Sequence, residues 1–252
     1  MAGPHENDPP PVTILSPDGE APFVLVCEHA SNYIPARYQA LGLPAHELLR
    51  HIAWDLGAAE LTRLLSERLG ASAFLSGVSR LLIDVNRPVA SPTSIPEFSE
   101  IPIPGNKGVS EAERRLRIET WFDPFHMAVE GCLDTRLRHR RPSAVIGVHS
   151  FTPVLAGAVR SMHAGVLFGA SASFGRAILA DLRREERLDI AENAPYRIDA
   201  DDWTIPFHAD RRNLAGVLLE VRNDGLQSRR ETEAWADRIS HALKAGWGAI
   251  EA

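Results

Sequence analysis

The sequence is poor in cysteine. Cys27 and Cys132 are its two cysteines in a chain of 252 residues. Their separation matches no zinc-binding or redox motif, and it excludes a disulfide-rich scaffold. Cys27 lies in an apolar run, where a thiol behaves as a small hydrophobic side chain. Because thiols without a disulfide pattern are typical of a reducing compartment, we expect a cytoplasmic protein.

The chain also lacks a long hydrophobic segment. No apolar run approaches the roughly 18 residues needed to span a bilayer, so no membrane partner is expected. The segment Met1–Pro11 is polar and rich in proline, unlike a signal peptide. We therefore expect residues 1–12 to be disordered or loosely attached. Because no linker interrupts the remainder, residues 13–252 are predicted to form one domain.

Several other functional signals are absent. Lysine and arginine number 27 against 33 aspartates and glutamates, for a net charge of −6, so no nucleic-acid partner is expected. Neither glycine-rich nucleotide-binding motif occurs. The G-x-S-x-G elbow of serine hydrolases is missing, since Ser150 stands in V-H-S-F-T. A serine hydrolase that uses Ser150 or Ser31 and needs no metal nevertheless remains one hypothesis for the function.

What the chain does contain is an alternation of short apolar runs and amphipathic segments. This alternation predicts an α/β fold with a mostly parallel sheet. Pro124 is expected to break or kink the long helical segment in which it stands. The expected strands are residues 23–27, 73–75, 79–85, 144–148, 164–169 and 216–221. The expected helices are residues 56–69, about 110–138, 173–187 and about 229–243.

Polar side chains stand at the ends of four of these apolar runs. They are Glu28 with His29, Asp84 with Asn86 and Arg87, His149 with Ser150, and Glu220 with Arg222. In a parallel sheet the carboxyl ends of the strands lie together and bind ligands. Two histidines and an acidic group at that edge suit a zinc site with an open fourth position. Zinc there would lower the pKa of a bound water to about 7.

Several polar residues of the chain also have a simpler structural interpretation. Asp55 stands where it could cap the following helix. Glu220, inside an apolar strand, is either ion-paired or functional, and we favour function. Asn86 suits a turn. His126 has aromatic neighbours and is more typical of a core histidine, whereas His208 lies in a polar segment as a lid residue or an exposed one.

A set of short motifs runs through most of the chain, in a consistent order and spacing. Together they resemble the N-formylglutamate amidohydrolase family, in its branch of short proteins. The motifs are E-H-A-S-N at 28–32, W-D-L-G-A at 54–58, S-R-L-L-I-D-V-N-R-P at 79–88, His126, G-V-H-S-F-T-P at 147–153, N-A-P-Y at 193–196 and L-E-V-R-N-D at 219–224.

The resemblance implies a fold and an activity. The family is similar to zinc carboxypeptidases and aspartoacylases, so we expect a single-domain three-layer sandwich around a mixed central sheet, of the phosphorylase/hydrolase-like kind. The implied reaction removes an N-acyl group from a small-molecule amino acid. For the reaction that gives the family its name, N-formyl-L-glutamate and water yield L-glutamate and formate.

The resemblance also implies roles for individual residues. His29 and His149 correspond to the two histidine ligands of Zn²⁺. The carboxypeptidase pattern H-x-x-E would place the acidic ligand at position 32, which is Asn32 here. Asp55 is therefore the expected acidic ligand, with Glu28 as the alternative. Glu220 resembles the general base.

Substrate binding is implied for a second group of residues. Asn86 and Arg87 resemble the pair that grips the substrate carboxylate in related enzymes, and Arg80 and Arg222 are further cationic candidates. The family usually has proline where Glu28 stands, and the loop before Pro195 also differs in detail. Both departures concern the identity of the substrate rather than the zinc chemistry.

The expected function is thus a zinc-dependent amidohydrolase that acts on an N-acyl, in the first instance formyl, derivative of an acidic amino acid. Two alternatives remain. One is an N-acyl amino acid deacylase with a different substrate. The other is a non-catalytic protein that binds a small acidic ligand through Arg80 and Arg87.

Overall fold

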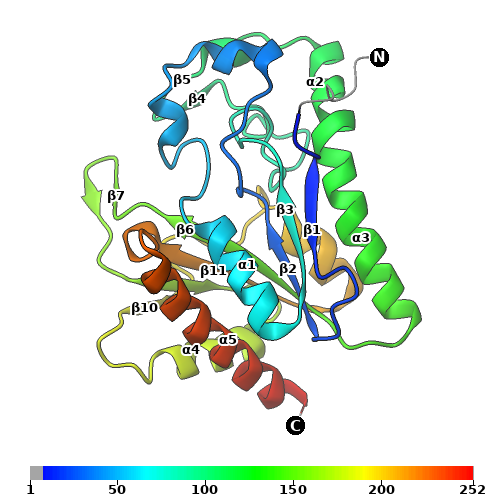
Figure 1. The fold of residues 1–252 in the computed structure, drawn as a ribbon, viewed down its shortest axis with the longest axis vertical. Helices are drawn as coiled ribbons and strands as arrows, with labels where there is room; N and C mark the ends of the chain where they lie inside the picture. Colours follow the sequence, from blue (N-terminus) through cyan, green and yellow to red (C-terminus); the bar gives the residue numbers. More distant parts are fainter. Residues whose placement is uncertain (1–7, 252) are drawn as a thin grey trace.

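The computed structural model describes residues 8–251, which form a seven-stranded mixed sheet between two layers of helices (Figure 1). The strand order is β1-β3-β2-β6-β11-β9-β10. The strands are β1 (Val12–Leu15), β2 (Phe23–Cys27), β3 (Ser72–Ser76), β6 (Ala144–Phe151), β9 (Ala164–Leu167), β10 (Ile190–Glu192) and β11 (Ala215–Arg222). The central strands β3, β2, β6 and β11 are parallel, whereas β1 and β9 run antiparallel to their neighbours β3 and β11. The expected three-layer α/β architecture is confirmed.

Helices cover both faces of the sheet, which explains its unbroken apolar strands. The layer on one face consists of α1 (Ala58–Leu69), α4 (Ala172–Leu182) and α5 (Arg229–Glu251). The other face carries α3 (Asp123–Arg138), which α2 (Glu111–Arg117) precedes in the chain. In β2 the side chains alternate between these layers. Phe23, Leu25 and Cys27 pack in the first core, and Val24 and Val26 pack in the second.

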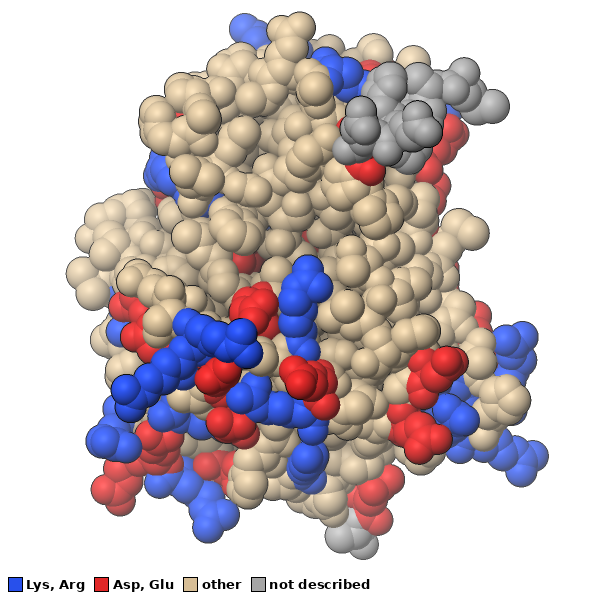
Figure 2. All heavy atoms as spheres, in the orientation of Figure 1, with Lys and Arg blue, Asp and Glu red and all other residues tan. Residues whose placement is uncertain are grey.

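Small hairpins and short turns complete the chain near the carboxyl edge of the sheet. β4 (Phe98–Ser99) pairs with β5 (Ile101–Pro102), and β7 (Val154–Leu155) pairs with β8 (Ala158–Val159). The face drawn in Figure 2 carries charged side chains of both signs in its lower half. Ion pairs such as Arg238–Glu185, at 2.6 Å, join neighbouring helices and loops on the surface.

The prediction of a strand at residues 79–85 is wrong. This segment forms turns, in which the Leu82 amide donates to the Ser79 carbonyl at 2.9 Å and the Asp84 amide donates to the Ser94 carbonyl at 2.8 Å. Its apolar side chains are nonetheless buried, including Leu82 and Ile83. β3 already has β1 and β2 as neighbours, so no sheet edge is free beside it. Burial, not strand pairing, accounts for the apolar run.

The long helical segment continues through Pro124 without a break, and a π-helical turn lies directly before the proline. α2 ends at Arg117, a π-helical turn spans Ile118–Phe122, and α3 begins at Asp123 with Pro124 in its first turn. The backbone stays in the right-handed helical region at both junctions, with φ of −61° at Ile118 and −71° at Phe122, and the Asp123 amide donates to the Ile118 carbonyl five residues back, so the π-helical turn accommodates the proline within a continuous helix. Ser110 caps α2, since its hydroxyl accepts a hydrogen bond from the Glu113 amide at 3.2 Å.

The amino-terminal segment expected to be loose, residues 1–12, is described from residue 8 onward. Asp8 accepts a hydrogen bond from the Tyr33 hydroxyl at 2.8 Å, and β1 already begins at Val12. Loose attachment therefore does not extend to these described residues, while residues 1–7 lie outside them. Among the described helices, none is both long enough and apolar enough to cross a membrane.

Candidate active site

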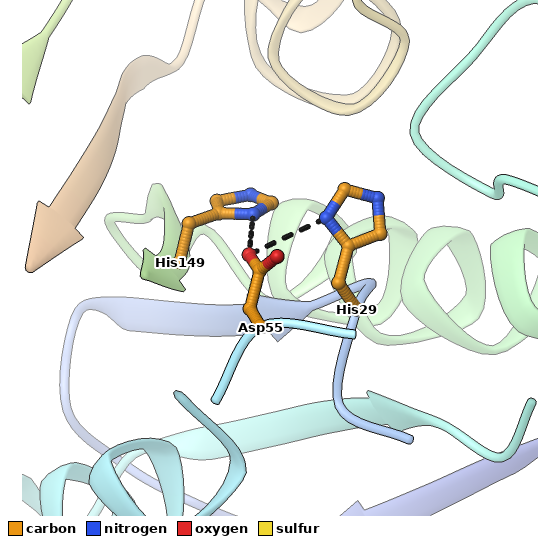
Figure 3. Close-up of side chains that lie close together, drawn as sticks. All are labelled: His29, Asp55 and His149. Atoms are coloured by element: carbon orange, nitrogen blue, oxygen red, sulfur yellow. Dashed lines mark hydrogen bonds and ion pairs between the residues drawn. The ribbon is translucent and has the colours of Figure 1, made fainter. Parts of the chain in front are cut away.

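Three residues predicted as metal ligands meet at the carboxyl edge of the sheet. His29 follows β2, Asp55 precedes α1 and His149 lies in β6 (Figure 3). Each offers a ligand atom within 4.8 Å of the others, and all three are buried. Asp55 Oδ2 lies 2.9 Å from Nδ1 of His149 and 3.4 Å from Nδ1 of His29. The parallel strands thus bring together residues far apart in sequence.

The side chain of Asp55 does not cap α1. The N-cap position belongs to Gly57, whose φ of 82° suits glycine, and no side-chain capping bond is made. Asp55 contributes to the turn through its backbone, because its carbonyl accepts the Ala58 amide at 3.1 Å. Its carboxylate is therefore free to face the histidines, and it also accepts the Ser150 amide at 3.3 Å.

A second carboxylate faces the other nitrogen of each histidine ring. Asp84 Oδ1 lies 2.8 Å from Nε2 of His29, and Glu28 Oε2 lies 3.3 Å from Nε2 of His149. A carboxylate at Nε2 favours the proton on that nitrogen, which leaves the lone pair of Nδ1 available as a ligand. Glu28 faces Nε2 of His149, whereas Asp55 faces Nδ1 of both histidines. Asp55 is therefore the acidic member of the three-residue group.

The electrostatics of the group favour a cation. Burial opposes ionisation of Asp55, but the neighbouring His29 and His149 hold the pKa of its carboxyl well below the usual range. Burial also opposes a charge on His149, yet Glu28 and Asp55 raise the pKa of its imidazole well above the ordinary value. The surrounding carboxylates therefore favour positive charge here, which either protons or a metal ion can supply.

Glu220 lies in β11 directly opposite His149 in the parallel pairing with β6. It is 7% exposed, and among residues 8–251 its buried Oε2 has no hydrogen-bond partner. Burial, with a contribution from the negative charge of Asp55, raises the pKa of its carboxyl to about 7. The alternative of an ion-paired structural glutamate receives no support, because the described residues form no salt bridge with it.

These groups line an open cavity of about 460 Å³. Its polar wall includes His29, Asp55, His149 and Glu220. The remaining wall mixes charged side chains with apolar ones, namely Ile52, Leu81, Pro96, Phe98, Phe151, Leu155, Leu167 and Leu218. The cavity is large enough for a small amino-acid derivative, since ligand sites commonly have volumes of about 300–1,000 Å³.

Two of the predicted substrate-binding arginines lie in this cavity but already have partners. Arg80 donates to Asp84 Oδ2 at 2.9 Å and lies 3.5 Å from Asp55 Oδ1. Arg87 donates from Nη1 to the Asp201 carbonyl at 2.9 Å and to Asp202 Oδ1 at 3.0 Å. Arg80 thus lies beside the metal-ligand candidates, and Arg87 fixes the loop that contains Asp202.

The other two predicted substrate-binding residues, Asn86 and Arg222, also have hydrogen-bond partners in this structure. Asn86 lines the cavity, but its Oδ1 accepts the backbone amides of Trp203 and Thr204 at 3.3 and 2.9 Å. Arg222 is not among the residues of the cavity wall, and it donates to Asp224 at 2.8 Å and to the Ser161 carbonyl at 2.7 Å. The structure therefore does not bring Arg222 to the site.

His126 and His208 form a buried pair outside the cavity. Nε2 of His126 lies 2.7 Å from the Val85 carbonyl, so it donates there, and Nδ1 of His126 then accepts from Nε2 of His208 at 2.8 Å. Burial lowers the pKa of His126 to about 4, and that of His208 is lowered as well. Both rings are thus neutral core histidines, and His208 is neither exposed nor a lid residue.

Sequence reasoning missed the roles of Asp84 and Glu28 as partners of the histidine rings. Both residues were visible at the ends of apolar runs, but which ring nitrogen they face depends on tertiary contacts. It also missed Asp202, whose carboxylate joins Arg87 and Asn86 from the loop before His208. A mixed α/β sheet whose edge carries a buried His–Asp–His group beside a glutamate is an arrangement typical of metal-dependent hydrolases.

Comparison with known proteins identifies the kind of hydrolase. The family model for N-formylglutamate amidohydrolase matches residues 21–227. The chain belongs to the N-formylglutamate amidohydrolase family and is a hydrolase that acts on an amide. No curated protein matches the chain.

Two solved structures share the fold over nearly the whole chain. A gene product of Agrobacterium tumefaciens is 36% identical, with 96% of each chain covered and a TM-score of 0.92. The N-formylglutamate amidohydrolase of Ralstonia eutropha is 16% identical, with 96% of this chain and 98% of that chain covered and a TM-score of 0.67. At that identity the second likeness concerns the fold alone.

Proposed function

We propose that this protein is a zinc-dependent amidohydrolase that removes the acyl group from an N-acyl amino acid, with N-formyl-L-glutamate as the first candidate substrate. The observation that carries the proposal is the buried group of His29, Asp55 and His149 with Glu220 on the neighbouring strand. Membership of the amidohydrolase family supports the reaction class. The family description supports the choice of N-formyl-L-glutamate.

The residues of the group fit a zinc ion. Two imidazole nitrogens and one carboxylate oxygen are the donor set of many catalytic zinc sites, whereas magnesium and calcium favour oxygen ligands. The Nε2–carboxylate contacts with Asp84 and Glu28 hold both rings in orientation, as outer-sphere carboxylates do in zinc sites. Among residues 8–251, Oε1 of Glu28 and Oε2 of Glu220 have no hydrogen-bond partner, and a divalent ion would offset the negative charge of these carboxylates.

Zinc bound by these residues would supply a water of lowered pKa and polarise the acyl carbonyl. Glu220 accepts the proton of the attacking water and then donates it to the leaving nitrogen. Burial raises the pKa of the Glu220 carboxyl in the metal-free fold, which favours the acceptance of a proton at this position. Arg80, which faces the cavity beside Asp55, stabilises the charge that develops on the acyl oxygen. The products are the free carboxylic acid and the amine of the amino acid.

The structure gives no support to the serine alternative. The Ser150 hydroxyl donates to the Leu56 carbonyl at 2.8 Å, and the histidine beside it in sequence, His149, faces Asp55 and Glu28. The Ser31 hydroxyl accepts the Tyr33 amide at 3.1 Å. Neither hydroxyl has a histidine as a hydrogen-bond partner among the described residues, so neither has the general base that a serine nucleophile needs.

The proposal is tested by assaying formate and glutamate release from N-formyl-L-glutamate, before and after zinc is removed with a chelator and restored. Other N-acyl amino acids, such as N-acetyl and N-formyl derivatives of neutral residues, belong in the same panel. Zinc-dependent release from one of these substrates supports the proposal. Binding without turnover across the panel would favour the non-catalytic alternative, and turnover that resists the chelator would exclude the zinc mechanism.

A further inference from the structure

One arginine of the cavity differs from the other two. Arg80 is engaged by Asp84, and Arg87 is engaged by Asp202 and the Asp201 carbonyl. Arg197 also lines the cavity, but its exposed side chain forms no hydrogen bond or ion pair with any residue from 8 to 251. Of the described arginines in the cavity wall, it alone has its whole guanidinium available to a ligand.

The backbone that carries Arg197 is held against β9 and β10. The Asn193 amide donates to the Val166 carbonyl at 3.0 Å, and Asn193 Oδ1 accepts the Phe168 amide at 2.9 Å. A Cβ at Gly165 would overlap the Ala194 carbonyl, so glycine permits this close approach. The segment that leads to Arg197 is therefore fixed on the sheet, while the side chain of Arg197 remains unengaged.

Acidic side chains line the cavity wall near Arg197, so the free guanidinium itself must supply the attraction for an anionic group. Asp199, Asp201 and Asp202 line the neighbouring wall. The carboxylate of Asp201 accepts from Ser91 and Thr93 and that of Asp202 from Arg87, so these aspartates shape the loop. A substrate carboxylate placed among them would be repelled. The free guanidinium of Arg197 offers paired donors that match a carboxylate in a bidentate arrangement.

We infer that Arg197, rather than Arg87, binds a carboxylate of the substrate amino acid. This assignment rests on the proposed function and makes it more specific. It assigns substrate binding to a residue that carries none of the roles implied by the sequence motifs. Because the interaction is present before and throughout the reaction, its loss should raise KM and leave kcat nearly unchanged.

The first test compares the native protein with Arg197→Ala on N-formyl-L-glutamate. Loss of a charged hydrogen-bonded pair should lower kcat/KM by about 10- to 100-fold, mainly through KM. Arg197→Lys should recover part of the loss, since it restores the charge without the paired donors. Arg187→Ala is the matched control, because Arg187 is exposed outside the cavity. Unchanged KM in Arg197→Ala would overturn the assignment.

N-formyl-L-glutamine and N-formyl-L-isoglutamine, each lacking one carboxylate, show which carboxylate Arg197 holds. The effect of Arg197→Ala should vanish on the amide that lacks the bound carboxylate and persist on the other. An equal effect on the acid and on both amides would mean that the substitution acts through the loop and not through a carboxylate, which would contradict the assignment.

A binding measurement separates this assignment from the proposed function. Calorimetric titration of N-formyl-L-glutamate into zinc-loaded Glu220→Gln and into Glu220→Gln/Arg197→Ala requires no turnover. Affinity that is about 10- to 100-fold weaker in the double variant supports the role of Arg197, even if the native protein fails to hydrolyse the ligand. Equal affinity, or no binding to either variant, overturns it. Binding without hydrolysis by the native protein would count against the proposed function alone.

Discussion

Glu220 and His149 stand opposite each other in the parallel register of β11 and β6, so a carboxylate and a candidate metal ligand lie side by side at the sheet edge. Both belong to strands buried between the two helical layers, and their backbones are fixed by the sheet. A proton acceptor built on the strand beside a metal ligand is held more rigidly than one on a loop. The proposed mechanism depends on this relationship.

The first prediction concerns the base itself. Glu220→Gln keeps the shape of the side chain but cannot accept a proton, so turnover should fall by about 10²- to 10⁴-fold. Zinc content should stay unchanged, because Glu220 lies outside the three-residue metal group. Steady-state rates and elemental analysis of the same sample measure both. Glu233→Gln on the surface of α5 is the control, and near-native turnover in Glu220→Gln would remove Glu220 from the base role.

The second prediction concerns the carboxylates behind the histidines. Asp84→Asn and Glu28→Gln remove the negative charge that faces Nε2 of His29 and His149. Each should weaken zinc binding by about 10- to 100-fold, as loss of outer-sphere partners does elsewhere. Competition with a chromophoric chelator gives the dissociation constants, with exposed Asp134→Asn as the control. Affinities equal to the native value would show that these contacts do not support the metal site.

The third prediction is a pH dependence of folding stability in the metal-free protein. The pKa of Glu220 is raised from 4.5 to about 7 in the fold. Between these values the unfolded chain releases a proton that the folded chain keeps, so this residue lowers stability as pH rises. Glu220→Gln lacks the effect. At pH 8 the variant should be more stable than the native protein, by an amount on the order of a few kcal/mol.

Urea unfolding after chelator treatment, at pH 5 and at pH 8, measures that difference. The gap between Glu220→Gln and the native protein should be small at pH 5 and large at pH 8. Carboxylates remote from Glu220 titrate alike in both proteins and cancel in the comparison. A gap that is the same at both pH values would show that the carboxyl of Glu220 has an ordinary pKa.

The fourth prediction concerns the loop that closes one wall of the cavity. Asn86→Ala would leave the buried amide of Thr204 without its acceptor, and that of Trp203 would lose a weaker one. An unsatisfied buried amide costs about 1–3 kcal/mol, so the free energy of unfolding should fall by that amount. Chemical denaturation measures it, with Thr135→Ala on the surface of α3 as the control. A large rise in KM at unchanged stability would instead indicate a direct role for Asn86 in substrate binding.

Strand ends carry positional information, which allowed the sequence to place His29, His149 and Glu220 at one edge of the sheet, whereas Asp55 was named through the family resemblance. His149 and Glu220 lie in buried apolar runs and His29 directly follows one, and parallel strands place their carboxyl ends at one edge. The same reasoning failed for Arg222, which lies two residues beyond Glu220 and is about 7 Å further along the strand. There it meets the carbonyls of a neighbouring loop rather than the cavity.

Other features depended on contacts that no local pattern reveals. Residues 79–85 are apolar because they are buried, and only the neighbours of β3 decide that they cannot pair as a strand. Arg87 was expected in substrate binding, but Asp202, from a distant segment, engages it. Arg197 has no hydrogen-bond or ion-pair partner among residues 8–251, and such a lack of partners becomes visible only in the folded chain.

The most direct test of the account is the metal content of the protein, purified without a histidine tag or chelator, beside the His29→Ala/His149→Ala variant. His139→Ala, outside the described metal group at the end of α3, is the control. The account predicts about one zinc per chain in the native protein and the control, and almost none in the double variant. Native protein that holds no metal even after incubation with zinc, or a double variant that holds as much as the native protein, would contradict it.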